Sequence, residues 1–359
     1  MATFIFCTNT NWHNEPPRCR HQLARQFAKF GKVIFIQKGG GENKSKNPEP
    51  GIFIEDTPVM PFSRKLELLI PFLKMYENLI FNRFLRKLIK KEEEIFILNF
   101  RYNLVIANDI KVPVFYVCND EFTIYHPWPI SKLLAWYEKQ TIRRSDLSFA
   151  ISMPLVEKIK KISSKVLKFN PGLEVSDYEQ VPNLISKTGK KISVGHGGFL
   201  NNRLDYEVIE KLARNENFSV EIFGKVEGTF AQEKMEEFKK LGVKVSGPSF
   251  AQDFFNKLSE FDALIIPYLI LKNTSAISMP NKVLQYLQTG RPVFITAIPH
   301  LDKDLYPVVQ AMQGNDWGKI IIETIQTDSS EKQMRRIGFS KLYTWENSAK
   351  LMWEQMQKL

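Results

Sequence analysis

Cysteine is scarce in this sequence, and long apolar runs are missing altogether. The three cysteines, Cys7, Cys19 and Cys118, are too scattered for a metal site or for the disulfide framework of a small secreted domain. No stretch is apolar for the roughly 20 residues that a bilayer-spanning helix needs, and residues 1–10 lack the basic start of a signal peptide. We therefore expect free thiols and a cytoplasmic protein.

The composition is that of a folded protein with an excess of positive charge. The chain has 359 residues, of which 43% are hydrophobic and 25% are charged, which is enough for two domains with a core each. The formal net charge of +11 favours an anionic partner: nucleic acid, nucleotide phosphates or a membrane surface. Nucleic acid fits the charge only, because the basic residues form no known nucleic-acid-binding motif, and we expect no nucleic-acid partner.

Much of the excess charge falls in residues 60–91, where eight basic residues stand against two acidic ones among Leu, Ile and Phe. Pro71 divides this segment, and residues 72–91 have a broad apolar face with Lys and Arg gathered toward its end. The pattern fits an amphipathic helix that lies on an anionic membrane surface. It fits equally well a helix that packs on a core and exposes a solvated basic face.

Short apolar strands alternate with amphipathic helices in both halves of the chain, which is typical of α/β domains with a parallel sheet. The expected strands are 3–7, 33–37, 95–100, 114–118, 147–151, 191–195, 219–224, 243–247, 263–268 and 293–297. The expected helices are 17–30, 64–91, 130–145, 205–215, 231–241, 251–259, 280–288 and 344–359. Residues 171–183, which are rich in turn formers, form the expected linker between domains 1–170 and 184–343.

The most informative motif is SMPNKVLQYLQTGRPV, residues 278–293. Pro280 suits the first turn of a helix, and Gly290 suits its end. Free N–H groups at such a helix start, with Lys282 beside them, would bind a phosphate, and Gln285 one turn later could bind a hydroxyl. The alternative is an ordinary helix with an exposed lysine.

Two further strand ends carry polar residues, and ligands of open α/β sheets bind beyond the carboxyl ends of the strands. After the strand in KISVGHGG, Gly198 allows close approach to the backbone, and Arg203 could reach a phosphate or be merely solvated. After VFYVC come Asp120, Glu121 and His126. An Asp in that position can accept a proton from a hydroxyl nucleophile, or it can cap the following turn.

The loop after the first strand, NTNWHNEPPRCRHQ, leads into a helix with Arg18, Arg20 and His21 in its first turns. Positive charge at a helix start opposes the helix dipole, so a bound anion or an acidic neighbour would explain it. The alternative is that the two arginines pair with surface carboxylates.

Together these stretches resemble a GT-B glycosyltransferase of the bacterial cell-surface polysaccharide type, near family 4 and the capsule, teichuronic-acid and exopolysaccharide transferases. The motifs that carry the resemblance are WHNEPPRCRHQLA (12–24), VCNDEF (117–122), RRSDLSFAISMPLVEKI (143–159), FNPGLEVSDY (169–178), GGFLNNRLDYEVIEKLA (197–213), FDALIIPY (261–268) and residues 278–293. The resemblance implies two facing Rossmann-like domains with the active site between them. The first would bind the acceptor, the second the nucleotide sugar, and residues 344–359 would cross back to the first.

The resemblance also implies roles for the matching residues. Lys282 and Arg203 would neutralise the diphosphate, and Asp120 would be the candidate catalytic base. The other residues expected around the nucleotide sugar are Gly198, Tyr268, Ser278, Asn281 and Gln285. The residues expected on the acceptor side are Trp12, His13, Arg18 and His126.

The sequence departs from the family pattern at Gln285, where relatives carry a glutamate, and at Ile277, where the first glutamate of the pair would fall. An amide can still bind a pair of hydroxyls. We find no DxD pair of the kind that would hold a metal beside the diphosphate, so we expect a metal-independent enzyme that needs no cofactor beyond its nucleotide-diphosphate sugar.

The expected function is transfer of a hexose to a glycan or lipid-linked glycan acceptor in bacterial surface polysaccharide synthesis. The protein would be cytoplasmic or bound to the inner face of the plasma membrane through residues 60–91. Two alternatives stay open: a catalytically silent GT-B subunit, and a nucleotide-sugar 2-epimerase, for which no clear set of acid and base groups is visible.

Overall fold

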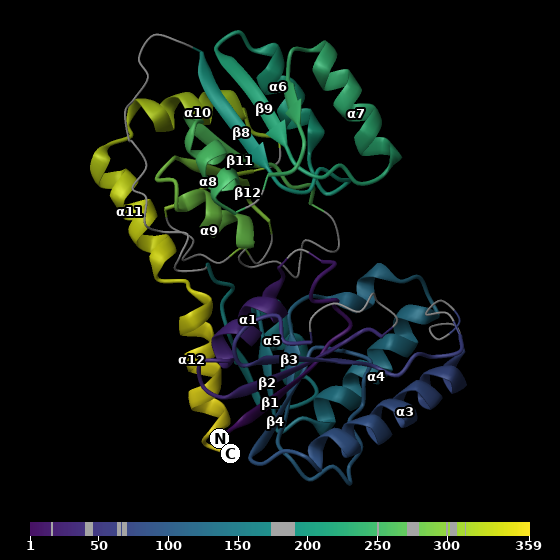
Figure 1. The fold of residues 1–359 in the computed structure, drawn as a ribbon. Helices are drawn as coiled ribbons and strands as arrows, with labels where there is room; N and C mark the ends of the chain where they lie inside the picture. Colours follow the sequence, from purple (N-terminus) through teal and green to yellow (C-terminus); the bar gives the residue numbers. More distant parts are fainter. Residues whose placement is uncertain are drawn as a thin grey trace. The chain divides into compact units, whose positions relative to one another are not determined.

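The computed structural model describes the whole chain except residues 16, 40–45, 63–65, 67–69, 174–190, 250, 271–279, 299–300, 302–306 and 313, and it describes residues 125 and 251 by their backbone only. The chain forms two compact units (Figure 1). The first comprises Met1–Asn170 together with Trp345–Leu359, and the second comprises Pro171–Thr344. Most of the expected linker, residues 171–183, lies outside the described residues.

The first unit is built on a seven-stranded parallel sheet with the strand order β3-β2-β1-β4-β5-β6-β7. Its strands are β1 (Thr3–Cys7), β2 (Lys32–Gln37), β3 (Ile52–Asp56), β4 (Ile95–Asn99), β5 (Val114–Cys118), β6 (Leu147–Ala150) and β7 (Val166–Lys168). Its helices are α1 (Cys19–Phe27), α3 (Pro71–Ile89), α4 (Ile130–Arg144), α5 (Met153–Lys160) and α12 (Trp345–Met356), with a 3₁₀ turn η1 (Phe122–Tyr125).

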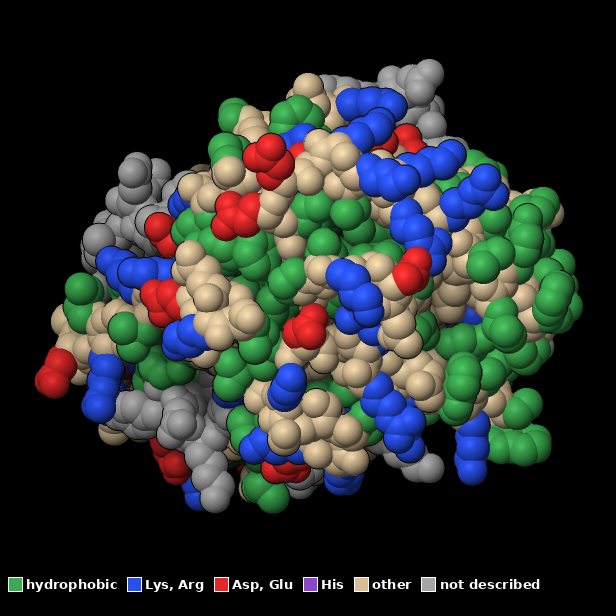
Figure 2. All heavy atoms as spheres, turned by 90° about the horizontal axis from the view of Figure 1, so that it is seen from below, with side chains coloured by type: hydrophobic (Ala, Val, Ile, Leu, Met, Phe, Trp, Pro, Cys, Tyr) green, Lys and Arg blue, Asp and Glu red, His purple; other side chains and the backbone are tan. Residues whose placement is uncertain are grey.

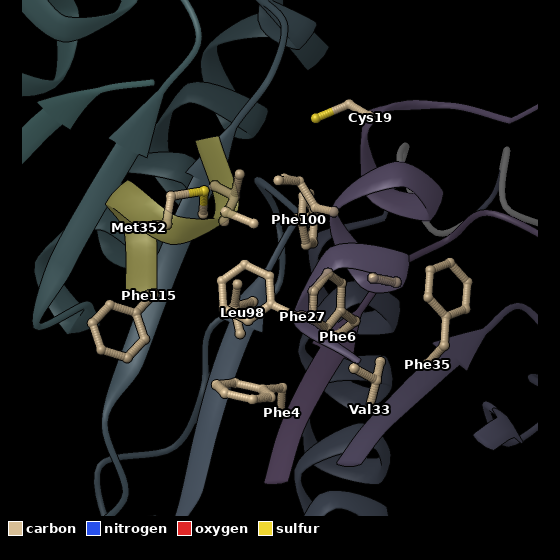
Figure 3. Close-up of a cluster of buried hydrophobic side chains, with 14 of the residues drawn as sticks. Phe4, Phe6, Cys19, Phe27, Val33, Phe35, Leu98, Phe100, Phe115 and Met352 are labelled. Carbon is tan, nitrogen blue, oxygen red and sulfur yellow. The ribbon is translucent and has the colours of Figure 1, made fainter. Parts of the chain in front are cut away.

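The two faces of this sheet bury different helices because successive side chains of a strand point to opposite faces. Phe4 and Phe6 of β1 pack with Phe27 of α1 and with Met352 of α12. Figure 3 shows this cluster, with Met352 of the yellow helix pointing into it. On the other face, Ile5 and Cys7 pack with the apolar side of α3. The three cysteines are buried and unpaired, as expected.

The C-terminal helix therefore completes the core of the first unit. Trp353 of α12 makes edge-to-face contacts with Phe4 and Phe96, with ring centroids 5.0 Å apart in both cases. Ser348 donates a hydrogen bond to the carbonyl oxygen of Asn170 at 2.7 Å. The chain thus returns to the first unit after it leaves the second.

The second unit repeats the same plan with a six-stranded parallel sheet of order β10-β9-β8-β11-β12-β13. Its strands are β8 (Ile192–Gly197), β9 (Phe218–Phe223), β10 (Lys244–Ser246), β11 (Ala263–Ile266), β12 (Val293–Thr296) and β13 (Val309–Ala311). Its helices are α6 (Tyr206–Arg214), α7 (Thr229–Lys240), α8 (Ala251–Ser259), α9 (Asn281–Leu287), α10 (Trp317–Gln326) and α11 (Ser330–Lys341). One face of the sheet packs on α6, α7 and α10, and the other packs on α9.

The sequence-based expectation missed the strands β3, β7 and β13. β7 and β13 have three residues each, and β3 alternates buried and exposed side chains near its start, so none of the three gives a continuous apolar pattern. The helices α5, α10 and α11 were also not predicted. Residues 71–89 of the expected long basic helix form α3. No helix that the structure describes is both long enough and apolar enough to cross a bilayer.

Candidate functional site

Each sheet reverses its strand order next to its first strand, between β1 and β4 in the first unit and between β8 and β11 in the second. At such a reversal the connecting helices leave toward opposite faces, so a crevice opens at the carboxyl ends of the two strands. In the second unit, the crevice between β8 and β11 brings together residues from three separate segments. They are His196–Gly198 at the end of β8, the Ile265 carbonyl of β11 and Lys282 of α9.

Lys282 lies beside a buried histidine that the sequence did not single out. Nζ of Lys282 is 3.4 Å from Nε2 of His196, and Nδ1 of His196 is 2.8 Å from the carbonyl oxygen of Ile265. A carbonyl oxygen only accepts, so Nδ1 carries the proton and Nε2 presents its lone pair to the lysine. Burial, and next the charge of Lys282, lower the pKa of His196 to about 3, so the ring is neutral.

The Lys282 amine is held over Gly198. A methyl group at Gly198 would come within 2.6 Å of Nζ and 2.5 Å of Cε, and Gly198 has a φ of +119°, a conformation that other residues rarely adopt. Burial lowers the pKa of Lys282 to about 8. No carboxylate accompanies the amine in this crevice among the described contacts, so an anionic ligand would supply the missing counter-charge.

Tyr286, one helical turn beyond Lys282, fixes the backbone of this crevice. Its hydroxyl accepts the N–H of Gly197 at 2.7 Å and donates to the Gly197 carbonyl oxygen at 2.8 Å. Gly224, after β9, approaches Gly198 so closely that a Cβ at Gly224 would collide with the Gly198 carbonyl. A cavity of about 300 Å³ opens beside Gly224, between β9, β10 and α7. Tyr286 and Gly224 thus both hold the backbone at Gly197 and Gly198.

The loops that follow β8 and β11 are joined to each other near the same crevice. The N–H of Leu269 donates to the Arg203 carbonyl oxygen at 2.9 Å, and Leu204 forms an isolated bridge with Tyr268. Burial raises the pKa of Tyr268 to about 12, and the charge of Arg203 acts against that rise. Arg203 and Tyr268, both expected at the nucleotide, thus lie together.

The remaining residues expected at the donor lie on or before α9. The helix begins at Asn281 with Pro280 as its N-cap, so Asn281 is exposed in the first turn and Gln285 is half-buried one turn later. Ser278 lies outside the described residues. Their roles toward a nucleotide stay predictions.

In the first unit, Asp120 lies two residues beyond the end of β5, and its Oδ1 accepts the N–H of Glu121 at 2.8 Å. Burial lowers the pKa of Arg20, and the Asp120 carboxylate is among the nearby groups that oppose this shift. Arg20 donates to the Thr10 hydroxyl, whereas its buried Nε has no hydrogen-bond partner in the described part of the chain. Arg20 therefore brings a positive charge toward the candidate base.

Glu121 stabilises the turn that follows β5. Its carboxylate caps η1 by accepting the backbone N–H of Thr123 at 3.3 Å, and it also accepts the Thr123 hydroxyl at 2.6 Å. It forms an ion pair with Lys158 at 2.7 Å. His126, at the C-terminal end of η1, is half-buried. The role of Asp120 as the catalytic base stays a prediction.

The residues expected on the acceptor side occupy unequal environments. Trp12 is only 7% exposed, and its indole packs edge-to-face on Phe35 in the core. Half-buried His13 belongs to a turn in which Asn11 Oδ1 accepts its N–H at 3.1 Å. Arg18 is exposed and forms an ion pair with Glu15 at 3.0 Å, so an acidic neighbour is present at the start of α1. Contact of these residues with an acceptor stays a prediction.

Comparison with solved structures finds the same fold over the whole chain. The crystal structure of Anabaena HepE in complex with UDP and glucose matches with a TM-score of 0.71 and 14% identity over 99% of this chain and all of that one. Sucrose-phosphate synthase from Thermosynechococcus elongatus matches with a TM-score of 0.75 and 12% identity over 99% and 98%. WaaG, a glycosyltransferase involved in lipopolysaccharide biosynthesis, matches with a TM-score of 0.65 and 12% identity over 98% of both chains.

No protein-family model and no curated protein matches this sequence. At sequence identities of 12 to 14%, these matches show a shared fold alone. The two parallel sheets with their interleaved helices, and the helix that returns to the first unit, are nevertheless the arrangement that the sequence motifs predicted. The chain has the GT-B fold, with two Rossmann-like domains.

Proposed function

We propose that this protein is a glycosyltransferase that moves a sugar from a nucleotide-diphosphate donor to a glycan acceptor. The observation that carries the proposal is the Lys282 amine, held over the backbone of Gly198 at the crevice between β8 and β11. A partly desolvated cation at a strand reversal, held in the space that a glycine leaves by lacking a side chain, suits a diphosphate. The fold is shared with HepE, whose crystal structure holds UDP and glucose.

In the proposed reaction, the bond between the anomeric carbon and the diphosphate breaks, and negative charge grows on the leaving phosphate. A fixed cation stabilises that charge best where it develops, because it need not reorganise during the step. Lys282 takes this role, and Arg203 adds a second positive charge from the loop joined to Tyr268. The acceptor oxygen forms the new bond to the anomeric carbon, and Asp120 accepts the proton of that hydroxyl. In this scheme the protein cations replace a metal ion.

A nucleotide-release assay tests the proposal. UDP-, GDP-, CMP- and dTDP-sugars are offered to the purified protein, and free nucleotide is measured with and without glycan acceptors. We expect Lys282→Met to lower turnover about 10²- to 10³-fold, the effect of removing one fixed donor from a charged transition state. Lys240→Met, at the exposed end of α7, is the matched control.

The outcomes separate the proposal from its rivals. A silent subunit would bind a nucleotide sugar without releasing nucleotide, and an epimerase would change the sugar while leaving it attached. Near-normal nucleotide release by Lys282→Met would refute the assignment of this lysine.

The same proposal places the acceptor on a lipid at a membrane surface. Along the outer side of α3, at helical spacing, lie the exposed side chains of Phe72, Met75, Tyr76 and Leu79. Phe72 is 70% exposed and Leu79 is 65% exposed, values that are unusual for large apolar residues. Further along the helix the exposed residues become basic, with Arg83, Lys87 and Lys90.

Figure 2 shows hydrophobic side chains gathered on the right of the view, where α3 lies in Figure 1, with Lys and Arg nearby. An apolar stripe that continues into a basic one matches the two layers of an anionic membrane surface, acyl chains and phosphates. We infer that α3 binds the membrane at its surface and that the acceptor is lipid-linked, as synthesis of a cell-surface polysaccharide requires.

A further inference from the structure

A second polar pocket lies wholly within the first unit, at the edge where β1, β2, β3 and β4 end. Its volume is about 300 Å³. Asn9 follows β1, Thr57 follows β3, Arg101 and Asn103 follow β4, and Glu77 enters from α3. The pocket therefore occupies the strand-reversal crevice of the first sheet, the position at which α/β sheets bind ligands.

The floor of this pocket is a buried ionic network. Glu77 accepts hydrogen bonds from both Lys74 and Arg101, one to each carboxylate oxygen. The guanidinium of Arg101 lies 5.1 Å from the ring centroid of Phe81, which also lines the pocket. The hydrogen bond to the Glu77 carboxylate holds the Arg101 guanidinium in place.

Two buried atoms of the floor lack partners. Arg101 is 4% exposed and Asn103 is 3% exposed, yet neither Nε of Arg101 nor Oδ1 of Asn103 has a hydrogen-bond partner among the residues that the structure describes. A buried polar atom without a partner costs about 1–3 kcal/mol, so most such atoms are matched by a ligand or by water. Both residues line the pocket, so a molecule inside it lies next to the side chains that carry these atoms.

The chemistry of this unpartnered pair indicates what that molecule is. Nε–H of Arg101 only donates, and Oδ1 of Asn103 only accepts. A phosphate or carboxylate could serve the arginine but not the amide oxygen, and an ammonium could serve only the amide oxygen. A hydroxyl group both donates and accepts, so hydroxyls satisfy both atoms.

The walls favour a ring over an open chain of hydroxyls. Phe81, Phe62, Val59 and Met60 line the pocket with apolar surface beside the polar floor. A pyranose likewise combines apolar and polar surface, with C–H groups on its ring faces and hydroxyls at its rim. A volume of about 300 Å³ is at the small end of ligand pockets, which suits a single sugar ring.

We propose that this pocket binds one neutral sugar ring of the acceptor, through the unpartnered atoms of Arg101 and Asn103. The identification of this sugar as part of the acceptor rests on the proposed function, whereas the binding of a sugar does not. The ring of Phe62 lies 6.2 Å from that of Tyr76 on the exposed side of α3. One helix thus supplies Glu77 and Phe81 to the pocket and an apolar face to the outside, so a lipid on that face leaves its sugar within reach of the pocket.

The test uses the full chain and binding alone. Methyl α-glucoside, methyl α-mannoside and methyl β-N-acetylglucosaminide are titrated by saturation-transfer NMR in the presence of UDP. We expect at least one to bind, and Asn103→Leu to weaken it about tenfold, the effect of one hydrogen bond and one buried partner lost. Val59→Trp fills the pocket from an exposed position, so it weakens binding without disturbing the core.

The control is Leu351→Trp, which adds the same bulk to an exposed position of α12, outside the pocket lining. Thermal unfolding verifies that each variant is folded. Absence of glycoside binding to the unmodified protein overturns the proposal. It is also overturned if both pocket variants bind the glycoside as tightly as the unmodified protein does. Binding of inorganic phosphate that displaces the glycoside also overturns it, in favour of an anion. UDP binding is measured separately by calorimetry, so its failure counts against the donor site and not against this pocket.

Discussion

Nζ of Lys282 lies 3.4 Å from the bare Nε2 of His196, a ring nitrogen that is left unprotonated because Nδ1 donates to the Ile265 carbonyl. The strand β8 thus presents a neutral acceptor to a lysine that arrives from α9, 86 residues later in the chain. A neutral partner directs the amine without cancelling its charge, whereas a carboxylate would cancel it. His196 is therefore a positioning residue for the cation.

The pH profile of the donor reaction should follow Lys282. Burial lowers the pKa of its amine to about 8, so the amine is charged below pH 8 and loses its proton above it. We expect kcat/KM for the nucleotide sugar to be level below pH 8 and to fall about tenfold per pH unit above it. Lys282→Arg, which stays charged, should remove this fall if it retains activity. An unchanged fall in that variant would assign the pH dependence to another group.

Lys282→Met should make the protein more stable while it impairs function. The pKa of Lys282 is lower in the folded protein than its ordinary value of 10.5, so its charge destabilises the fold below pH 8. That penalty disappears as the pH rises from about 8 to 10.5. We expect Lys282→Met to gain roughly 1–3 kcal/mol in the free energy of unfolding at pH 7, and less at pH 10. Denaturant titrations at both pH values measure the difference, and a loss at pH 7 would contradict it.

Gly198→Ala should displace the cation. Its methyl group would lie 2.5 Å from Cε of Lys282, and the backbone at φ +119° would be strained, which costs of order 1–3 kcal/mol. Gly242→Ala is the matched control, because Gly242 has a φ of +82° and nothing within 4 Å of the added methyl group. We expect both variants to be destabilised, and only Gly198→Ala to lose UDP affinity in calorimetry. Equal UDP affinity in the two would show that Gly198 leaves Lys282 in place.

The outer side of α3 should bind anionic vesicles. We expect co-sedimentation with phosphatidylglycerol vesicles at low salt, and weaker binding as salt screens the basic residues. Phe72→Ser with Leu79→Ser removes two exposed apolar side chains, and Met312→Ser with Met334→Ser removes two from the second unit as a control. The α3 double variant should bind at least tenfold more weakly than the control. Equal binding by the two double variants would exclude this face as the membrane contact.

The sequence was informative wherever local patterns decide the structure. Gly198 was identifiable because it follows an apolar strand, and Lys282 because it lies in a helix start marked by Pro280. The alternating helices and strands predicted two Rossmann-like units, and the apolar residues at helical spacing predicted α12. The weak points were short elements such as β7 and β13, whose three residues carry too little pattern.

His196 and Tyr286 could not be recognised in the same way. His196 looks like the end of a buried strand, and its role depends on which carbonyl of β11 lies beside it. Tyr286 looks like a core residue of a helix, because its contact with Gly197 joins positions 89 residues apart. A histidine directly before two glycines at a strand end is the one local signal that pointed there. The pocket residues Arg101 and Asn103 carry no motif, and only the folded backbone shows their unpartnered atoms.

The return of α12 to the first unit has a consequence for the order in which the protein folds. Trp345, Ala349, Met352 and Met356 belong to the core that holds Phe4 and Phe6, so this core stays open until the ribosome has made residue 356. The second unit is one uninterrupted stretch, Pro171–Thr344, and its strands β8 to β13 are synthesised before α12. During synthesis the part made later can therefore finish folding first, while the first 170 residues wait with an apolar sheet face uncovered.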